Sequence, residues 1–448
     1  MLRLRLLRRP AKQDCMAMTF RGFSSSRTIP LRHDARLWYG KSMKMLLWFL
    51  VSIILIVGAF FVGRSRMTRV SESSRASHVD SYAELRDVES ISLSFDELSA
   101  FFKKLAQEKG AEYAFGALRV AKFPADTDLH LLGHVVGDEL YKQKGLAGIA
   151  VCTNDFRNAC SHSIVVGLLL EKGESALPHI AQACRQAPGG SGAYTMCYHG
   201  LGHGILAYVG YNFDRAITLC GKTGTQGEAP QCIGGAMMEI ISGGGHNREL
   251  WARERVKYLI KNAPLTPCTS NIMPADGRIF CLIYITPYLW EAVGADLGHP
   301  TDKDFSASFK FCDTLRADDT AGRDACFGGF GKEFTTLANA RDIRNVDQMN
   351  DQQMRQVYDW CMLAGIKNGT AACLTHAMNS LYWGGENKPA GAIRFCGVIS
   401  DEYQQRSCFL NLIQSVHTYQ SNARYRQDFC KQLPEEYVIP CKETLLIK

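Results

Sequence analysis

The placement of cysteine constrains the fold of this chain more than any other feature of its sequence. Of seventeen cysteines, only Cys15 lies before residue 150. The others form neighbouring pairs 11 to 14 residues apart, with the first pair closer: Cys152 and Cys160, Cys184 and Cys197, Cys220 and Cys232, Cys268 and Cys281, Cys312 and Cys326, Cys361 and Cys373, Cys396 and Cys408, and Cys430 and Cys441. An even number at a repeated spacing is typical of an exported, disulfide-bonded domain, and the sequence has no CxxC motif of the kind found in zinc thiolate sites. We therefore predict eight disulfides, each between sequence neighbours.

The same cysteines mark an internal repeat. The first cysteine of each later pair lies at position 184, 220, 268, 312, 361, 396 or 430, which gives a period of 34 to 49 residues. Periods of this size are typical of helix-pair repeats, and no sustained period-two pattern indicates strands. Glycines after the second cysteine, namely Gly234, Gly235, Gly328 and Gly329, are expected to let neighbouring helices approach closely. The sequence predicts an all-α domain of disulfide-clipped αα-hairpin repeats, forming either an open solenoid or a closed toroid.

Helix pairs clipped by cysteines resemble the Sel1-like and other tetratricopeptide-type repeats, particularly the cysteine-rich secreted Sel1-like members. The resemblance is architectural and covers roughly residues 150 to 441. The cysteine spacing here is wider, and the small-and-aromatic consensus of that family is not traceable in any unit. The element Cys197-Tyr-His199-Gly also resembles the Cys-His-Gly element of the lanthionine-cyclase toroids, which bind zinc. Because we expect Cys197 to form a disulfide, no ligand assignment follows from this second resemblance.

One segment has the length and composition of a membrane helix. Residues 45–63 carry no charge, which is about the span that a bilayer requires. Residues 1–44 contain eleven Lys or Arg against two acidic residues, so the positive-inside rule places the amino terminus in the cytoplasm. We favour an uncleaved, single-pass signal anchor over a cleavable signal peptide, because the apolar run is long and no small-x-small site follows it cleanly. The Arg-rich, Ser-containing start also resembles a transit peptide or translated upstream sequence.

These features divide the chain into four parts. A basic cytoplasmic tail (1–44) and the transmembrane helix (45–63) are followed by a flexible tether (64–90), rich in Ser and Arg, and by an extracytoplasmic repeat domain (91–448), periplasmic or extracellular. The whole chain has a net charge of +7, and subtracting the +9 of the tail leaves −2 for the remainder. The basic balance therefore belongs to the tail, and the domain lacks the basic face expected of a nucleic-acid partner.

Histidine recurs at one place in three successive helical segments. It lies two residues after a cysteine in Cys160-Ser-His162 and Cys197-Tyr-His199, and two residues after aspartate in Asp128-Leu-His130. A second histidine follows four residues later in two of these segments. Residues four apart share a helix face, and packed helices lie about 8 to 10 Å apart, so the five side chains are expected to converge. Such spacing suits zinc, iron or copper. The predicted metal ligands are His130, His134, His162, His199 and His203.

Three carboxylates are candidates for catalysis at such a centre. Asp138 follows His134 by one turn, Glu139 is adjacent, and Glu239 lies in the next repeat, seven residues beyond its second cysteine. An acid beside metal-bound water can act as a general base for hydrolysis. The alternatives are a polar seam between repeats, in which the histidines only form hydrogen bonds, and bis-histidine haem ligation, for which no CxxCH attachment motif is present.

Two functions follow from these expectations. The first is a membrane-anchored, extracytoplasmic protein with a histidine metal centre, acting as a metal-dependent hydrolase or oxidoreductase at the cell envelope. The second is a non-enzymatic repeat scaffold that binds a protein or an envelope polymer along its concave face. The first requires the histidines to converge on an ion, whereas the second tolerates their loss.

Overall fold

The computed structural model of the chain describes residues 82–89, 93–124, 127–153, 155–187, 190–224, 227–243, 247–343, 346–384, 388–420 and 422–447. Throughout these ranges the regular structure is helical, without a single β-strand, so the all-α prediction is confirmed. The predicted cytoplasmic tail, the membrane helix over 45–63 and most of the tether lie outside these ranges. Among the helices inside them, none is both long and apolar enough to cross a bilayer.

The first helices show where the folded domain begins. Helix α2 (Leu85–Glu89) falls inside the predicted tether, yet Leu85 and Val88 are buried, so the end of that segment belongs to the core and the boundary near residue 91 was placed too late. Helix α3 (Phe95–Lys109) is capped by Ser94, which forms a capping box with Glu97. Helix α4 (Ala111–Val120) follows directly and ends before Pro124.

All eight predicted disulfides are present, and seven of them join the two helices of a hairpin. The hairpins are α7 (Leu177–Gln186) with α8 (Gly190–Tyr208), α9 (Phe213–Cys220) with α10 (Glu228–Ser242), α12 (Thr266–Thr269) with α13 (Ala275–Tyr284), α15 (Asp302–Asp313) with α16 (Thr320–Ala338), α17 (Asp351–Met362) with α18 (Lys367–Gly384), α19 (Ala390–Val398) with α20 (Glu402–Tyr419), and α21 (Ala423–Cys430) with α22 (Glu435–Thr444). The eighth, Cys152–Cys160, ties α6 (Ala159–Lys172) to the segment before it. Helices α11 (Arg248–Arg255) and α14 (Thr286–Val293) lie between hairpins.

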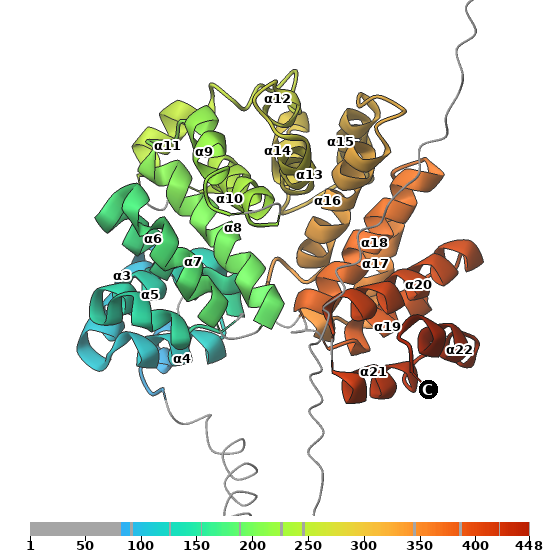
Figure 1. The fold of residues 1–448 in the computed structure, drawn as a ribbon, viewed down its shortest axis with the longest axis horizontal. Helices are drawn as coiled ribbons and strands as arrows, with labels where there is room; N and C mark the ends of the chain where they lie inside the picture. Colours follow the sequence, from blue (N-terminus) through green and yellow to red (C-terminus); the bar gives the residue numbers. More distant parts are fainter. Residues whose placement is uncertain are drawn as a thin grey trace, which may run out of the picture. The chain divides into compact units, whose positions relative to one another are not determined.

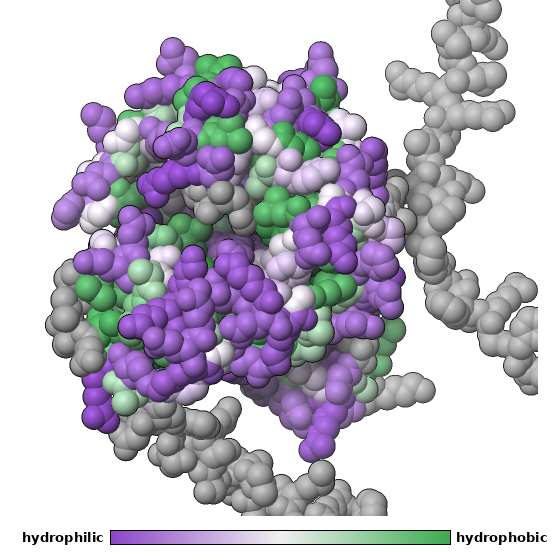
Figure 2. Space-filling view, turned by 90° about the vertical axis from the view of Figure 1, so that its left-hand side faces the viewer, coloured by the Kyte–Doolittle hydropathy of each residue, from purple (hydrophilic) through white to green (hydrophobic). Residues whose placement is uncertain are grey.

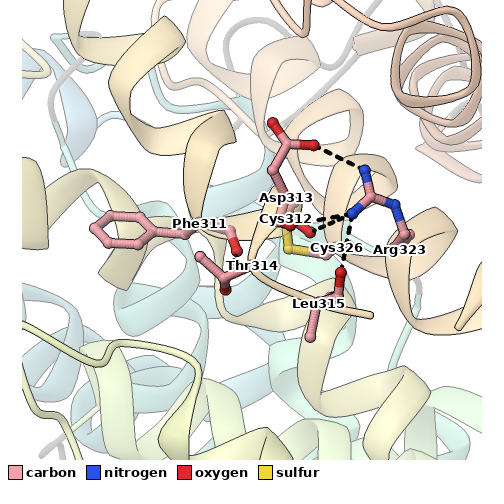
Figure 3. The surroundings of a disulfide bond; sticks show 7 residues. All are labelled: Phe311, Cys312, Asp313, Thr314, Leu315, Arg323 and Cys326. Carbon is pink, nitrogen blue, oxygen red and sulfur yellow. Dashed lines mark hydrogen bonds and ion pairs between the residues drawn. A yellow bond between two sulfur atoms is a disulfide. The ribbon is translucent and has the colours of Figure 1, made fainter. Parts of the chain in front are cut away.

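Figure 3 shows the surroundings of one of these disulfides. Cys312 at the end of α15 is bonded to Cys326 in α16, and Arg323 lies one turn before Cys326. The Arg323 guanidinium donates to the carbonyl oxygens of Cys312, Asp313 and Leu315 at 3.1 to 3.3 Å, and to the Asp313 carboxylate at 2.7 Å. The last carbonyls of a helix have no partner within it. A side chain of the second helix therefore caps the first helix beside the disulfide.

The second helices of the hairpins form a continuous layer. Helix α5 (Leu129–Lys144) packs on α6, and the series continues through α8, α10, α13, α16, α18 and α20, each helix packing on the next. Figure 1 shows these helices following one another in chain order. Glycine is required where they touch: a Cβ on Gly202 would lie 1.9 Å from the Cys232 carbonyl oxygen, and one on Gly331 would lie 1.8 Å from that of Cys373. The four glycines predicted at such contacts occupy them, Gly235 against the His199 carbonyl, Gly329 against that of Ile283, Gly234 against Tyr284 and Gly328 against His376.

The surface of the domain is mainly polar on the face drawn in Figure 2. Hydrophilic side chains dominate this face, and apolar ones form separate small patches. Scattered apolar residues are normal on surfaces exposed to water. The histidines predicted to converge lie in the interior, where α5, α6 and α8 meet.

Candidate metal centre

Five histidines from three consecutive helices of this continuous layer come together. Helix α5 carries His130 and His134, α6 carries His162, and α8 carries His199 and His203. Asp128 caps α5 by accepting from the Leu131 amide at 2.9 Å. Eight pairs among the five rings have centroids 4.7 to 6.2 Å apart. The convergence expected from the sequence is therefore a feature of the structure.

Small residues beside the histidines make this convergence geometrically feasible. A Cβ on Gly200 would lie 2.3 Å from Cδ2 of His162, and one on Gly137 would lie 2.7 Å from the Ser163 side chain. Glycine in a helix costs about 1 kcal/mol relative to alanine. At these positions the cost is offset by contacts that no larger residue permits, and these contacts bring the imidazoles of α5, α6 and α8 together.

The two histidines of α5 direct their Nε2 atoms toward each other. These atoms lie 3.2 Å apart. Nδ1 of His130 lies 2.7 Å from the Phe156 carbonyl oxygen and so donates to it. Nδ1 of His134 lies 3.1 Å from Oγ of Ser163, whose hydroxyl donates to the His134 carbonyl at 3.0 Å and therefore accepts from the ring. With both protons on Nδ1, two Nε2 lone pairs face each other, an arrangement that a cation between them stabilises.

The two histidines of α8 repeat this pattern with a carboxylate. Nε2 of His203 and Nε2 of His199 lie 3.4 Å apart. Nδ1 of His203 donates to the Glu239 carboxylate at 3.0 Å, and Tyr211 donates to the other oxygen of Glu239 at 3.2 Å. A carboxylate that holds Nδ1–H of an imidazole is the usual outer partner of a metal-ligating histidine.

His162 lies centrally among the other four. Its ring centroid is 5.5 to 5.7 Å from each of theirs, its side chain is 0% exposed, and within the described structure neither ring nitrogen has a hydrogen-bond partner. Nδ1 of His199 is likewise buried without a partner. An unsatisfied buried polar group costs roughly 1–3 kcal/mol, and such groups are few in natural proteins. A coordinated ion would satisfy a ring nitrogen of His162.

Burial keeps the imidazoles of His130, His162 and His199 neutral. Removal from water, together with the neighbouring charge of His203, lowers the pKa of His130 to about 4. Burial also lowers the pKa of His162 and of His199 well below the ordinary value, again with a contribution from nearby histidines. The neutral imidazole is the form that binds metals. At neutral pH, these three side chains are therefore ready to act as ligands.

The spacing of the ring nitrogens fits a transition-metal ion. Ligand atoms of His130, His134 and His162 lie within 4.8 Å of one another, so this triad could hold a metal ion. Zinc binds histidine nitrogen at about 2.1 Å, and two nitrogens of a tetrahedral zinc are then about 3.4 Å apart. The Nε2 separations in the two pairs, 3.2 and 3.4 Å, are close to that value.

The three candidate carboxylates have different surroundings. Glu239 contacts the cluster through His203. Asp138 lines the same cavity as His130 and His134. Glu139 accepts from Gln107 at 3.4 Å and from Lys142 at 2.7 Å, on the side of α5 that packs against α3. Glu239 and Asp138 thus lie where they can act on the centre, whereas the contacts of Glu139 are to neighbouring polar side chains.

A cavity of about 500 Å³ opens beside the histidines. One part of its wall consists of His130, His134 and His203. Much of the remainder is contributed by segments distant in sequence and includes Tyr284, Trp290, Lys332, Glu333, Thr336 and Arg341, together with Arg157 from the segment before α6. This volume is typical of a site for a small organic molecule.

Arg157 reaches this cavity from a strained turn. Phe156, Arg157 and Asn158 are three successive residues with left-handed backbone, at φ of 55°, 54° and 64°. Non-glycine residues in this region cost about 1–3 kcal/mol each and cluster at functional sites. The turn places the Phe156 carbonyl against His130 and lets Arg157 donate to the Thr336 hydroxyl in α16.

Several of these residues were not identified from the sequence. Ser163 has a local signal, since it follows His162 directly and shares its helix. Arg157, Tyr284 and Lys332 have none, because their role depends on packing between segments that lie far apart in the chain.

Fold and site together define an all-α, disulfide-bonded protein with a buried histidine cluster able to hold a metal ion. Compared with family models, curated proteins and solved structures, the chain has no match.

Proposed function

We propose that the protein is a membrane-anchored, extracytoplasmic metalloprotein, and that its histidine centre acts as a metal-dependent hydrolase. The observation that carries this proposal is the geometry of the two histidine pairs. Their Nε2 atoms are 3.2 and 3.4 Å apart, while Nδ1 of His130, His134 and His203 is held by a carbonyl, a hydroxyl and a carboxylate respectively. Outer partners of this kind fix the tautomer that presents Nε2 to an ion.

Zinc, iron and copper all suit imidazole ligands. Hydrolysis is favoured because imidazoles are neutral and leave the full charge of the ion to lower the pKa of a bound water. Asp138 and Glu239 are two of the carboxylates that border the cavity, and they can accept a proton there. An oxidoreductase is the alternative if the bound metal is iron or copper.

The cellular location rests on the cysteines and on residues 45–63. Eight disulfides are expected only where the compartment is oxidising, and an uncharged run of this length suits a single membrane anchor. We propose that the hairpins stack as one continuous repeat array, either open or closed, on the extracytoplasmic side. The alternative function is a non-enzymatic scaffold that binds no metal. Such a scaffold would bind a partner protein or an envelope polymer.

The decisive experiment measures metal content. The full chain is produced in an oxidising compartment, extracted in detergent without a histidine tag, and analysed by elemental mass spectrometry. We expect near-stoichiometric zinc, iron or copper. His134→Ala should lose most of this metal while its circular dichroism stays helical, and His179→Ala, which changes an exposed histidine of α7, is the matched control.

Two results would contradict the proposal. If the wild-type chain takes up no metal even after incubation with zinc, iron(II) and copper, the histidines are packing residues and the scaffold function is favoured. If His134→Ala unfolds the domain in a preparation that contains no metal, the cluster has a structural role.

A further inference from the structure

The cavity wall away from the histidines is rich in cations and hydrogen-bond donors. We propose that it is a subsite for an oxyanion, a phosphate or carboxylate group of a small organic substrate, with Arg157 as the residue that binds it. This inference rests on the proposed function, since it names the class of substrate that the metal centre would act on.

Arg157 contributes a positive charge to this part of the wall. Its guanidinium donates to the neutral hydroxyl of Thr336, and no carboxylate of the described residues forms an ion pair with it. Its charge contributes to lowering the pKa of His130, His199 and Glu333, so it lies close to both the metal ligands and α16. A half-buried arginine with spare donors is the usual partner of a planar oxyanion, which it binds through two parallel hydrogen bonds.

Three further residues that line the cavity carry hydrogen-bond donors. The indole Nε1–H of Trp290 is buried and has no hydrogen-bond partner among the described residues. Burial raises the pKa of Tyr284 to about 12, so its hydroxyl keeps its proton. Lys332 pairs with Glu333, and its ammonium lies 4.7 Å from the centre of the Tyr284 ring. The Lys332–Glu333 pair is neutral overall, so Arg157 and Arg341 supply the positive charge of this part of the wall.

The strained turn before α6 gives a reason for the position of Arg157. Three consecutive left-handed residues are maintained against their conformational cost. The same turn provides the carbonyl that orients His130. It therefore couples the orientation of a metal ligand to the position of the anion-binding side chain, which is the arrangement a substrate spanning both groups would need.

The test uses the full chain loaded with metal, and titrates inorganic phosphate and benzoate separately by calorimetry. Arg157→Gly removes the guanidinium at a position whose φ of 54° glycine adopts easily, so the variant should fold. Arg157→Lys keeps the charge without the fork, and Arg185→Gln changes an exposed arginine of α7 as a control. Metal content is measured on every sample, so that failure of the metal centre is distinguished from failure of the subsite.

We expect the wild type and Arg185→Gln to bind one of the two anions equally well, Arg157→Gly to bind it ~10- to 100-fold more weakly, and Arg157→Lys to bind with intermediate affinity. Preference for phosphate or for benzoate assigns the anion class. Equal affinity in the wild type and Arg157→Gly, with metal bound in both, would overturn the subsite, as would the absence of binding of either anion by the metal-loaded chain.

Discussion

The same inter-repeat contact occurs in the amino-terminal and carboxy-terminal hairpins with different chemistry. His203 in α8 bonds Glu239 in α10, and Asn379 in α18 bonds Ser415 in α20. Both pairs join residues 36 apart, and in both the first residue lies six positions after the second cysteine of its hairpin and the partner seven positions after the next. The repeat therefore supplies a polar position in register, and the side chain placed there decides what it does.

The two regions differ in which hydrogen-bonding atoms stay available after this contact is made. A hydroxyl and an amide bond each other between α18 and α20, and Asn411 also donates to Thr375 across the same interface at 3.0 Å. An imidazole that donates through Nδ1 still has Nε2 to offer. The carboxy-terminal helices thus form the polar seam considered as an alternative for the histidines, whereas the amino-terminal helices direct additional ring nitrogens toward one point.

The largest effect that separates the two regions should come from pH. In protein stripped of metal, the depressed pKa of His130, His162 and His199 means that the unfolded chain binds more protons than the folded one below about pH 6.5. Their contribution to stability is full above pH 6.5 and is lost as pH falls toward the folded pKa, about 4 for His130. Each such group removes up to about 1.4 kcal/mol per pH unit.

Hydrogen exchange measures this loss helix by helix. Protection in α6 and α8 should fall between pH 7 and 5 more than protection in α18 and α20, after correction for the intrinsic pH dependence of exchange. Parallel loss in all four helices would show that the histidines do not set the local stability.

The next largest effect should come from the disulfides and be equal in size in both regions. Cys184 with Cys197, and Cys396 with Cys408, close loops of 13 and 12 residues. Replacing either pair with alanine should destabilise its hairpin by roughly 3 kcal/mol, since loops of this length have similar closure entropy. Metal content should fall only in Cys184→Ala/Cys197→Ala, because α8 carries two of the histidines. Metal loss in both double variants would indicate global unfolding.

Glycine contacts offer a smaller effect that should again be the same in both regions. Gly202→Ala and Gly331→Ala each place a Cβ against a backbone carbonyl of the next helix, at 1.9 and 1.8 Å before relaxation. Overpacking of this kind costs about 1–3 kcal/mol or more. Urea denaturation should show both variants destabilised relative to Gly397→Ala, whose Cβ would meet nothing within 4 Å. A neutral Gly202→Ala would mean that α8 and α10 can separate, and with them His203 and Glu239.

The sequence was sufficient for the features that depend on spacing. Cysteine intervals predicted every disulfide. Histidines at matching positions, two residues after a cysteine or after Asp128, predicted which rings would meet, because equivalent residues of adjacent packed helices lie side by side. It was insufficient for the cavity. Arg157 and Thr336 are 179 residues apart and meet only in the tertiary structure, where the turn before α6 reaches α16, and the left-handed turn at Phe156 to Asn158 contains no glycine to signal it. Glu139 was chosen for its proximity in sequence, but helix geometry places its contacts on the face toward α3.

The smallest and most specific effect should come from the two equivalent contacts themselves. Glu239→Gln keeps the size of the side chain but removes the charge that holds Nδ1–H of His203, so metal affinity should fall about 10- to 100-fold, as for other outer partners of ligating histidines. Ser415→Ala removes the matching contact to Asn379 and should cost about 1 kcal/mol of stability without changing metal affinity. Competition with a chelator of known affinity measures the first effect, and thermal unfolding measures the second. If Glu239→Gln loses stability but binds metal normally, the two contacts are equivalent in kind, and the amino-terminal histidines form a polar seam like that between α18 and α20.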